Sequence, residues 1–205
     1  MLVEHLGQSP KIHPDAVVAP GAVISGDVTI GAECQILHGA VISAEGGPIV
    51  LGEHVIVMEN AVLRASATDP LRIGDHCLVG PLASISGARL GDEVFIATGA
   101  RIFNGAVIGD RSEVRINAVV HLRTELPPQS TVPIGWVAVG SPAEMFPPDK
   151  HDEIWARQVK LDFPGYVFGL DRDTPDLMVQ LTERYARHLS RHAEDRPVEP
   201  GDSSD

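Results

Sequence analysis

Aliphatic residues recur at every sixth position through most of the chain. Within residues 30–42 they stand at Ile30, Ile36 and Ile42, and small residues follow the first two four places later, at Cys34 and Ala40. The same step, with two short interruptions and one step of five, places aliphatic residues at Ile12, Val18, Ile24, Leu51, Val57, Leu63, Ile73, Val79, Ile85, Leu90, Ile96, Ile102, Ile108, Val114 and Val120. A six-residue step would scatter these side chains around an α-helix, but it keeps them on one face of an extended chain. We therefore predict short strands wound into a parallel β-coil.

A second period of about three hexads predicts one repeated corner. The third residue after the middle anchor of each coil is Gly or Asn in five of six coils, and the column reads Gly21, Gly39, Asn60, Leu82, Gly99 and Asn117. Glycine and asparagine tolerate a left-handed backbone, whereas a leucine held there would cost on the order of 1–2 kcal/mol. Because Pro81 precedes Leu82, we expect this coil to deviate locally from its neighbours.

The pattern divides the chain into a coiled domain, 1–145, a helical extension, 146–192, and a tail, 193–205. The two interruptions, 44–50 and 65–72, are predicted to be corner loops. In the extension we expect one helix capped by Asp149 and ending near residue 161, a break at 163–166, and a second helix of roughly 16 residues that begins at Thr174 and Pro175. The tail is acidic, polar and contains proline, so we expect it to be disordered.

Charge and composition narrow the classes of partner. The net charge of −12 disfavours binding to nucleic acid or to anionic membrane surfaces. No apolar run reaches membrane-span length and no signal-like segment opens the sequence, so we expect a cytoplasmic protein that does not bind membranes. Cys34 and Cys77 fall in one column two coils apart, roughly 10 Å, which is beyond disulfide reach. We predict that both thiols are free and buried.

Several segments resemble the γ-class carbonic anhydrases and their hexapeptide-repeat relatives. They are GAVI (39–42), GGPIVLG (46–52), RIGD (72–75), ISGARLGDEVFIATGA (85–100) and VAVGSPAE (137–144). The resemblance covers roughly residues 10–145. It implies a left-handed parallel β-helix, a homotrimer and a C-terminal helix that packs along the coil. The repeat itself says little about chemistry, because acyltransferases use it as well.

The resemblance also implies a zinc ion between subunits, held by three histidines. Two histidines would come from one chain, one coil apart, and the third from a neighbouring chain. The matching positions in this sequence are Arg64, Pro81 and Ser86. Arginine stays protonated, proline offers no donor atom and serine is a poor zinc ligand. We therefore expect no metal, no cofactor and no CO2 hydration at this site.

Neighbouring positions of the same interface pocket differ from the family as well. Ser43, Glu45 and Met58 stand where the resemblance implies arginine, aspartate and glutamine, and Glu59 keeps an acid. One hypothesis is that Arg64 pairs with Glu59 or Glu45 across the subunit boundary. The other is that Arg64 binds a small anion or a carboxylate metabolite.

An acyltransferase that uses an acyl-CoA donor is the alternative function. The Gly-Ser-Pro-Ala segment at 140–143 occurs in both groups and does not discriminate between them. Such a transferase would need a histidine base, for which His38 and His121 are the candidates.

The remaining histidines fall at one predicted corner and on the second predicted helix. His54 and His76 should stack at one corner, with Glu33 and Glu93 on either side. They could form a relocated metal site, but a solvated corner with alternating charges is favoured. His188 and His192 fall on the second helix among Arg184, Arg187 and Arg191, where we expect an exposed basic face.

Overall fold

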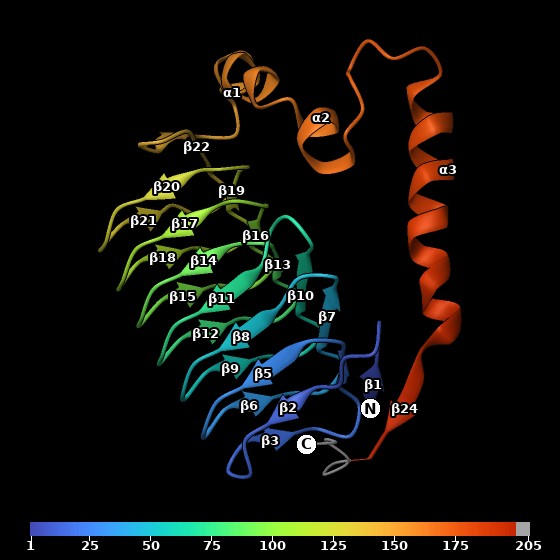
Figure 1. Ribbon diagram of the computed structural model, residues 1–205. Coiled ribbons are helices and arrows are strands. Elements are labelled where there is room, and N and C mark those ends of the chain that lie inside the picture. The colour runs from blue at the N-terminus through green and yellow to red at the C-terminus, as the bar shows by residue number, and fades with distance from the viewer. Residues whose placement is uncertain (200–205) are drawn as a thin grey trace.

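The computed structural model describes residues 1–199 and is a parallel β-solenoid with a helical C-terminal extension (Figure 1). Three sheets form its three faces, and each coil contributes one strand to each sheet. The largest sheet has ten strands, in the spatial order β23 (Glu144–Phe146), β22 (Val137–Val139), β19 (Val119–Val120), β16 (Arg101–Ile102), β13 (Ser84–Ser86), β10 (Val62–Ser66), β7 (Val41–Glu45), β4 (Val23–Ser25), β1 (Leu2–Glu4) and β24 (Arg196–Val198).

The other two sheets have seven strands each, and all of their pairings are parallel. One contains β2 (Lys11–Ile12), β5 (Val28–Ile30), β8 (Ile49–Leu51), β11 (Leu71–Ile73), β14 (Arg89–Leu90), β17 (Val107–Ile108) and β20 (Glu125–Leu126). The other contains β3 (Val17–Val18), β6 (Gln35–Ile36), β9 (Ile56–Val57), β12 (Leu78–Val79), β15 (Phe95–Ile96), β18 (Glu113–Val114) and β21 (Thr131–Val132).

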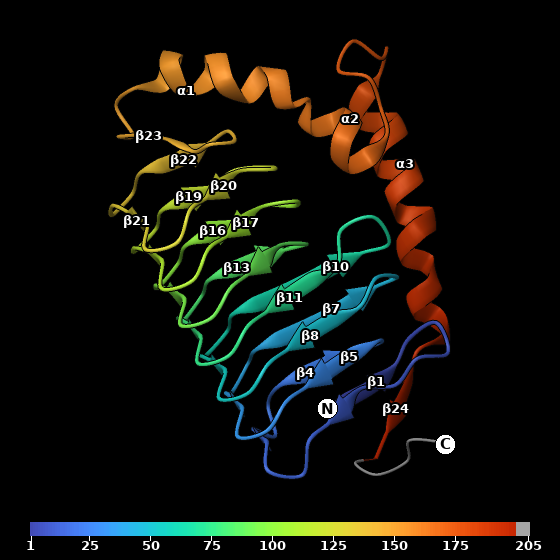
Figure 2. The same cartoon turned by 60° about the vertical axis from the view of Figure 1, so that its left-hand side comes forward.

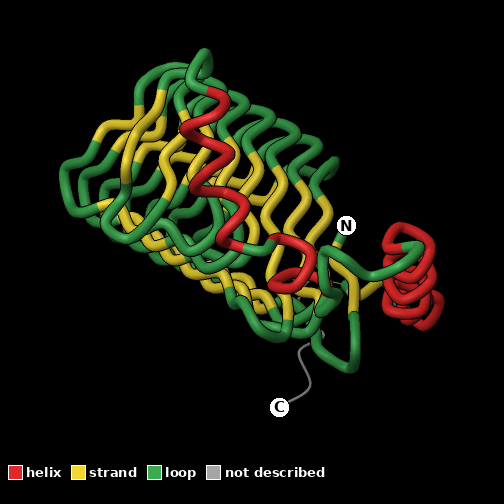
Figure 3. The backbone as a smooth tube through the Cα atoms, turned by 90° about the horizontal axis from the view of Figure 1, so that it is seen from above, coloured by secondary structure: helices red, strands yellow, loops and turns green. Residues whose placement is uncertain are grey.

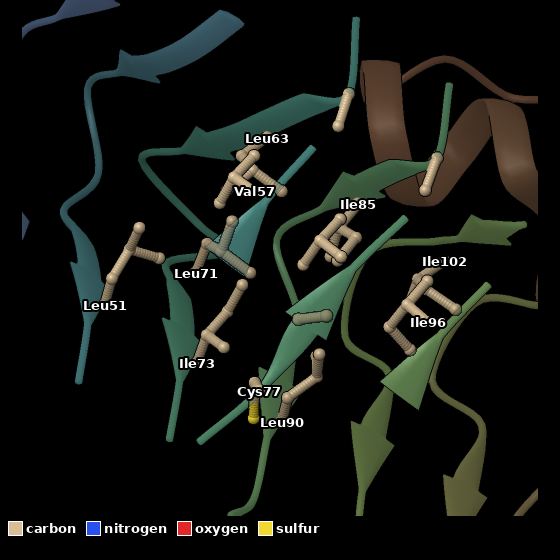
Figure 4. Close-up of a cluster of buried hydrophobic side chains, with 14 of the residues drawn as sticks. Leu51, Val57, Leu63, Leu71, Ile73, Cys77, Ile85, Leu90, Ile96 and Ile102 are labelled. Atoms are coloured by element: carbon tan, nitrogen blue, oxygen red, sulfur yellow. The ribbon is translucent and has the colours of Figure 1, made fainter. Parts of the chain in front are cut away.

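The aliphatic anchors stack in register inside the coil, as the six-residue period predicts. Leu63 pairs with Ile42 in the coil before it and with Ile85 in the coil after it, and all three are fully buried. Figure 4 shows part of this cluster, with anchors of all three sheets pointing into one interior. Each buried Leu, Ile or Val contributes about 1.5–3 kcal/mol relative to an exposed one, which makes this column the main source of stability. Cys34 and Cys77 are free and buried, which confirms the cysteine prediction.

The predicted corner exists, but Leu82 does not disturb it. Its φ of +60° matches +58° at Asn60 and +69° at Gly99, whereas Gly21 is not in the left-handed region. The backbone N–H of Leu82 still donates to the carbonyl of Glu59 at 3.0 Å. The expected local deviation of this coil is therefore wrong, and the leucine adopts the left-handed conformation instead.

A second corner is also left-handed, although the sequence there shows neither glycine nor asparagine. It is occupied by polar and charged residues with φ between +54° and +62°, namely Glu33, His54, His76, Glu93, Arg111 and Gln129. The ladder of backbone hydrogen bonds between coils fixes these corners, so side-chain preference is secondary.

The two interruptions form loops after the last residues of two neighbouring strands inside the largest sheet. They follow β7 and β10, the two five-residue strands of the solenoid, and leave residues 46–48 and 67–70 outside regular structure. The predicted corner loops are thus confirmed, with shorter bounds.

The helical extension differs in detail from its prediction. α1 (His151–Gln158) follows Lys150 and has no side-chain cap, so Asp149 does not cap it, and η1 (Val159–Leu161) continues it. The chain breaks at Asp162, whose φ is +45°. The expected break at 163–166 is instead the start of a helix, α2 (Phe163–Phe168), because the Asp162 side chain accepts a hydrogen bond from the Gly165 N–H.

The last described segment is ordered, contrary to the prediction for the tail. α3 (Leu177–Leu189) begins after Asp176 rather than at Thr174, and η2 (Ser190–Glu194) follows it. β24 then pairs antiparallel with β1 at the first coil. The expectation of disorder from residue 193 is therefore wrong through residue 199, and residues 200–205 lie outside the described part of the chain.

The extension crosses one end of the solenoid and returns along its length. α1 and α2 lie over the last coils, and α3 runs back beside β10, β7 and β1 (Figure 2). In Figure 3, α3 is seen nearly end-on and lies outside the stack of coils. Within residues 1–199, no helix has the length and apolar character that a membrane crossing requires.

Candidate functional site

A cavity of about 450 Å³ lies between the largest sheet and the helices α2 and α3. The solenoid contributes the ends of β7, β10 and β13 and the loop after β10. The helices contribute the opposite wall. The lining residues are Glu45, Arg64, Ala65, Ser66, Ala67, Thr68, Asp69, Ser86, Phe103, Asn104, Phe163, Val167, Phe168, Leu181, Arg184, Tyr185 and His188.

Arg64 and Ser86 stand next to each other in this cavity. They are paired in register between β10 and β13, one coil apart on the same face. The Arg64 Nη2 atom donates to the Tyr185 hydroxyl at 3.2 Å and lies 3.6 Å from the Glu45 Oε1 atom. Arg64 therefore contacts an acid of its own chain, whereas the sequence hypothesis placed this pair across a subunit boundary.

Glu45 is a buried carboxylate with three polar neighbours. The Ser43 hydroxyl donates to Glu45 Oε1 at 2.6 Å, and His192 Nε2 lies 3.0 Å from Glu45 Oε2. Burial tends to raise the pKa of Glu45, but the Ser43 hydroxyl, His192 and Arg64 together lower it below its ordinary value. The carboxylate is thus held ionised at the edge of the cavity.

The other predicted pocket residues do not reach this cavity within one chain. Met58, Glu59 and Pro81 lie at the corner that carries Asn60 and Leu82, and none of them lines the cavity. The carbonyl of Pro81 is part of the coil ladder, where it accepts the Gly99 N–H at 2.9 Å.

A second buried carboxylate, Asp69, fixes α2 over the cavity. The Tyr166 hydroxyl donates to Asp69 Oδ1 at 2.6 Å, and the Thr68 hydroxyl donates to Asp69 Oδ2 at 2.9 Å. Burial, with the hydrogen bond to the Asp69 charge, raises the pKa of Tyr166 to about 12. The guanidinium of Arg123 lies over the Tyr166 ring, 4.9 Å from its centre. Sequence reasoning missed this contact because it assigned Tyr166 to a break.

Aromatic rings form the apolar wall of the cavity. Phe103 meets the edge of Phe163 at 6.2 Å, Phe163 meets Phe168 at 5.8 Å, and Phe168 meets Tyr185 at 5.8 Å, all centre to centre. On a bare three-sided coil the Phe103 ring would be exposed. Instead, α2 of the same chain half-buries it.

The prediction that the second helix carries an exposed basic face is only partly correct. Arg184 is exposed, but its Nη1 atom donates to the carbonyls of Phe168 and Gly169 at 3.0 Å each. His188 is half-buried and lies parallel to the Tyr185 ring in the cavity wall. His192 is also half-buried and belongs to a separate cluster with His5 and Asp195.

The remaining histidines lie away from the cavity. His54 and His76 stack with ring centres 4.7 Å apart, and His54 Nδ1 lies 3.4 Å from a Glu33 oxygen on the exposed corner. Within residues 1–199, His5, His192 and Asp195, rather than this corner, form the group that could hold a metal ion. His121 is buried against Phe103, and burial lowers its pKa. Neither His121 nor His38 lines the cavity.

Comparison with known proteins assigns the family. The family model described as "Bacterial transferase hexapeptide (six repeats)" matches residues 9–44. "Gamma carbonic anhydrase 2, mitochondrial" of Arabidopsis thaliana is 30% identical over 149 residues, or 70% of this chain and 51% of that protein. The "Probable carbonic anhydrase" of Methanocaldococcus jannaschii is 38% identical over 115 residues, or 56% of this chain and 72% of that protein. The chain belongs to the γ-carbonic-anhydrase-like family of hexapeptide-repeat proteins.

Two further facts define how far this family relationship extends. The chain spans about half the length of the plant relatives it matches, 51% and 48%. The UDP-N-acetylglucosamine O-acyltransferase of Moraxella catarrhalis shares the fold, with a TM-score of 0.50 at 19% identity over 88% of this chain and 89% of that one. Identity at this level shows the fold alone. The chemistry of this γ-carbonic-anhydrase-like chain must be argued from its own cavity.

Proposed function

We propose that this γ-carbonic-anhydrase-like protein works without zinc at the former ligand positions and binds a small carboxylate or other small anion beside Arg64. The observation that carries the proposal is the Arg64 guanidinium, which stands in the cavity where the family resemblance implies an imidazole. A guanidinium has no lone pair for a metal ion and stays protonated at physiological pH. Zinc-bound water, on which CO2 hydration depends, then cannot form at this position.

The contacts of Arg64 leave room for an anion. Both of its polar contacts within residues 1–199 use the same atom, Nη2, and its side chain is 40% exposed. A guanidinium presents five N–H donors in a planar fork that matches a carboxylate. Nη1 and Nε can therefore bind a ligand while Nη2 keeps its contacts with Tyr185 and Glu45.

The cavity wall indicates what kind of anion fits best. Phe103 lines it from the solenoid, and Phe163, Val167, Phe168 and Leu181 line it from the helices. These apolar groups would contact the body of a ligand, while Arg64 would contact its charged end. A carboxylate with a short aliphatic or aromatic body therefore suits the cavity better than a bare inorganic anion does.

Thermal unfolding with acetate, butyrate and benzoate tests this proposal. A ligand that binds only the folded protein adds about 2.7 kcal/mol at 100 times its Kd. We expect butyrate or benzoate to raise the melting temperature more than acetate does, and Arg64→Gln to abolish the increase. Arg89→Gln, which changes an exposed arginine on another face, serves as the matched control. Equal stabilisation of Arg64→Gln and the native protein would refute the role of Arg64.

The loss of zinc chemistry has its own test. We expect CO2 hydration at background rate, with or without added zinc, because Arg64, Pro81 and Ser86 supply no imidazole ligand. The measurement is a CO2 hydration assay together with anomalous scattering at the zinc edge from crystals. Zinc located at Arg64, Pro81 and Ser86, or hydration above background, would contradict the proposal.

We keep acyl transfer from acyl-CoA as a second proposal because of His121. Its side chain is buried and its Nδ1 atom has no hydrogen-bond partner within the described residues. A neutral imidazole with a free nitrogen suits a general base, provided that binding of acyl-CoA exposes the buried Nδ1 atom. Stabilisation by acetyl-CoA that disappears in His121→Phe would favour this function, and no stabilisation by acetyl-CoA would exclude it.

A further inference from the structure

Three potential metal ligands from the two ends of the chain meet at the first coil. They are His5, just after β1, His192, in η2, and Asp195, just before β24. His5 Nδ1 lies 2.6 Å from Asp195 Oδ1, and His192 Nδ1 lies 2.8 Å from Asp195 Oδ2. One ligand atom from each residue lies within 4.8 Å of the other two. Two imidazoles thus face the two oxygens of a single carboxylate.

The other nitrogen of His192 is held by a further carboxylate. His192 Nε2 lies 3.0 Å from Glu45 Oε2, and the Ser43 hydroxyl orients Glu45 from the opposite side. A metal-binding histidine almost always donates its second ring N–H to such an acceptor, which fixes the tautomer and aims the free nitrogen at the metal. With Nε2–H on Glu45, the Nδ1 atom of His192 faces Asp195 Oδ2 at 2.8 Å, where a proton makes a hydrogen bond in the metal-free protein. A cation would take the place of that proton between the Nδ1 lone pair and the carboxylate.

The burial and surroundings of the cluster fit a small ion. His5 is only 3% exposed, so this polar ring lies inside the protein with Asp195 as its partner. A cavity of about 340 Å³, lined by Ser43, Ser25, His192 and Asp195 among others, opens beside the cluster. A water molecule in this cavity could complete a four-ligand set.

The geometry also shows what must change when an ion enters. Ligand atoms around a tetrahedral zinc ion, with bonds of about 2.0–2.1 Å, lie roughly 3.3 Å apart. The present separations of 2.6 and 2.8 Å would have to widen by about 0.7 and 0.5 Å, respectively. The two imidazole rings, now stacked with 23° between their planes, would have to turn so that both nitrogens face the ion.

We propose that His5, His192 and Asp195 bind a divalent cation of the zinc class and that Glu45 acts as the outer partner of His192. Two nitrogen ligands and one carboxylate oxygen suit zinc or cobalt better than magnesium or calcium, which prefer oxygen ligands. The three ligands are not those of the Arg64 cavity, but Glu45 connects the two places because it contacts both Arg64 and His192. The site joins the end of the chain to its beginning, and so fixes α3, none of whose side chains is fully buried.

The zinc content of the loaded protein tests the proposed metal site directly. Metal-free protein is dialysed against zinc on the alkaline side of neutrality, because metal ligands must lose their protons before they bind. We expect one zinc ion per chain by elemental analysis. The cobalt-loaded protein should show the strong visible absorption of a tetrahedral site. His5→Ala and Asp195→Asn should lose both signals.

Two further variants separate binding from folding. His188→Ala, one helical turn before His192, is the matched control and should keep one zinc ion per chain. Glu45→Gln keeps the shape of the outer partner and should weaken zinc binding about 10–100-fold. Circular dichroism of each variant checks that it is folded. Zinc that stays bound in folded Asp195→Asn, or native protein that retains no stoichiometric ion, would overturn the proposal.

Discussion

Leu82 shows that a single residue can occupy an unfavourable backbone region when its neighbours fix the chain. Its φ of +60° is the same, within a few degrees, as that of Asn60 one coil earlier. Backbone hydrogen bonds connect Leu82 to Glu59 below and Pro81 to Gly99 above. The geometry of the coil therefore decides the conformation, and leucine adopts it at a cost.

The strain at position 82 can be measured with two substitutions. Leu82→Asn and Leu82→Ala both replace an exposed leucine side chain by a smaller one, but only asparagine tolerates the left-handed region well. We expect Leu82→Asn to be more stable than Leu82→Ala by on the order of 1 kcal/mol in urea unfolding. Equal stabilities would mean that the corner carries no strain.

The corner residues also show which backbone conformations the sequence could predict and which it could not. The column of glycine and asparagine predicts one left-handed corner, and the structure places four of its members there together with Leu82. The second corner, with His54, His76 and Glu93, carries no such signal. Its conformation is imposed by hydrogen bonds between coils, which no local preference reveals.

At the scale of elements, α2 turns a bare face of the solenoid into a cavity. Phe163 covers Phe103, and Tyr166 reaches the buried carboxylate of Asp69. The sequence predicts a helix break at 163–166 because proline and glycine stand there. The Asp162 cap is a local contact to Gly165 that the sequence contains, but the packing of α2 on Phe103 is a tertiary contact that it does not reveal.

The bond between Tyr166 and Asp69 should therefore hold α2 in place. A hydrogen bond to a charged group contributes about 1.5–3 kcal/mol, so Tyr166→Phe should lower the free energy of unfolding by about that amount. A double-mutant cycle with Asp69→Asn checks the pair, and additive effects would contradict a direct contact.

The hydrogen bond between Tyr166 and Asp69 should also make the free energy of unfolding depend on pH. The pKa of Tyr166 is raised from 10.0 to about 12 in the folded protein. A group whose pKa is raised on folding stabilises the protein fully below its unfolded pKa and loses this contribution as the pH rises through the folded pKa. The contribution of Tyr166 should therefore decline between about pH 10 and pH 12, and Tyr166→Phe should lack this decline.

At the scale of the whole molecule, exposed apolar residues gather along one corner. Leu82, Ile116 and Ile134 are 56%, 45% and 65% exposed, and Pro81, Asn117 and Gly135 are their chain neighbours. This corner contains the position at which the family resemblance implies a zinc ligand for the neighbouring chain. We propose that it contacts a second subunit near Arg64.

Light scattering tests the assembly. We expect a homotrimer of three times 21.9 kDa, because contact between subunits would remove the corner from water. Ile134→Glu should shift the mass toward the monomer, since it would bury an unpaired charge. Val17→Glu, at an exposed valine outside this corner, should leave the mass unchanged. A monomeric native protein would refute the trimer.

The fold could be predicted from the sequence because every coil repeats the same burial pattern, with anchors such as Ile42, Leu63 and Ile85 in register. The cavity and the cluster of His5, His192 and Asp195 could not. Their members lie up to 190 residues apart in the sequence, and no period relates the extension to the coils. Only the path of α3 along the stack brings them together.

The largest sheet ends in a reversed strand on both sides, β23 at one end and β24 at the other. A stack of parallel coils with open ends would offer each end as a template on which the next molecule could continue the ladder, as in amyloid growth. An antiparallel strand interrupts the parallel hydrogen-bond pattern that a coil from another chain would have to continue. The two short strands β23 and β24 therefore cover both edges of the largest sheet and disfavour end-to-end polymerisation through it.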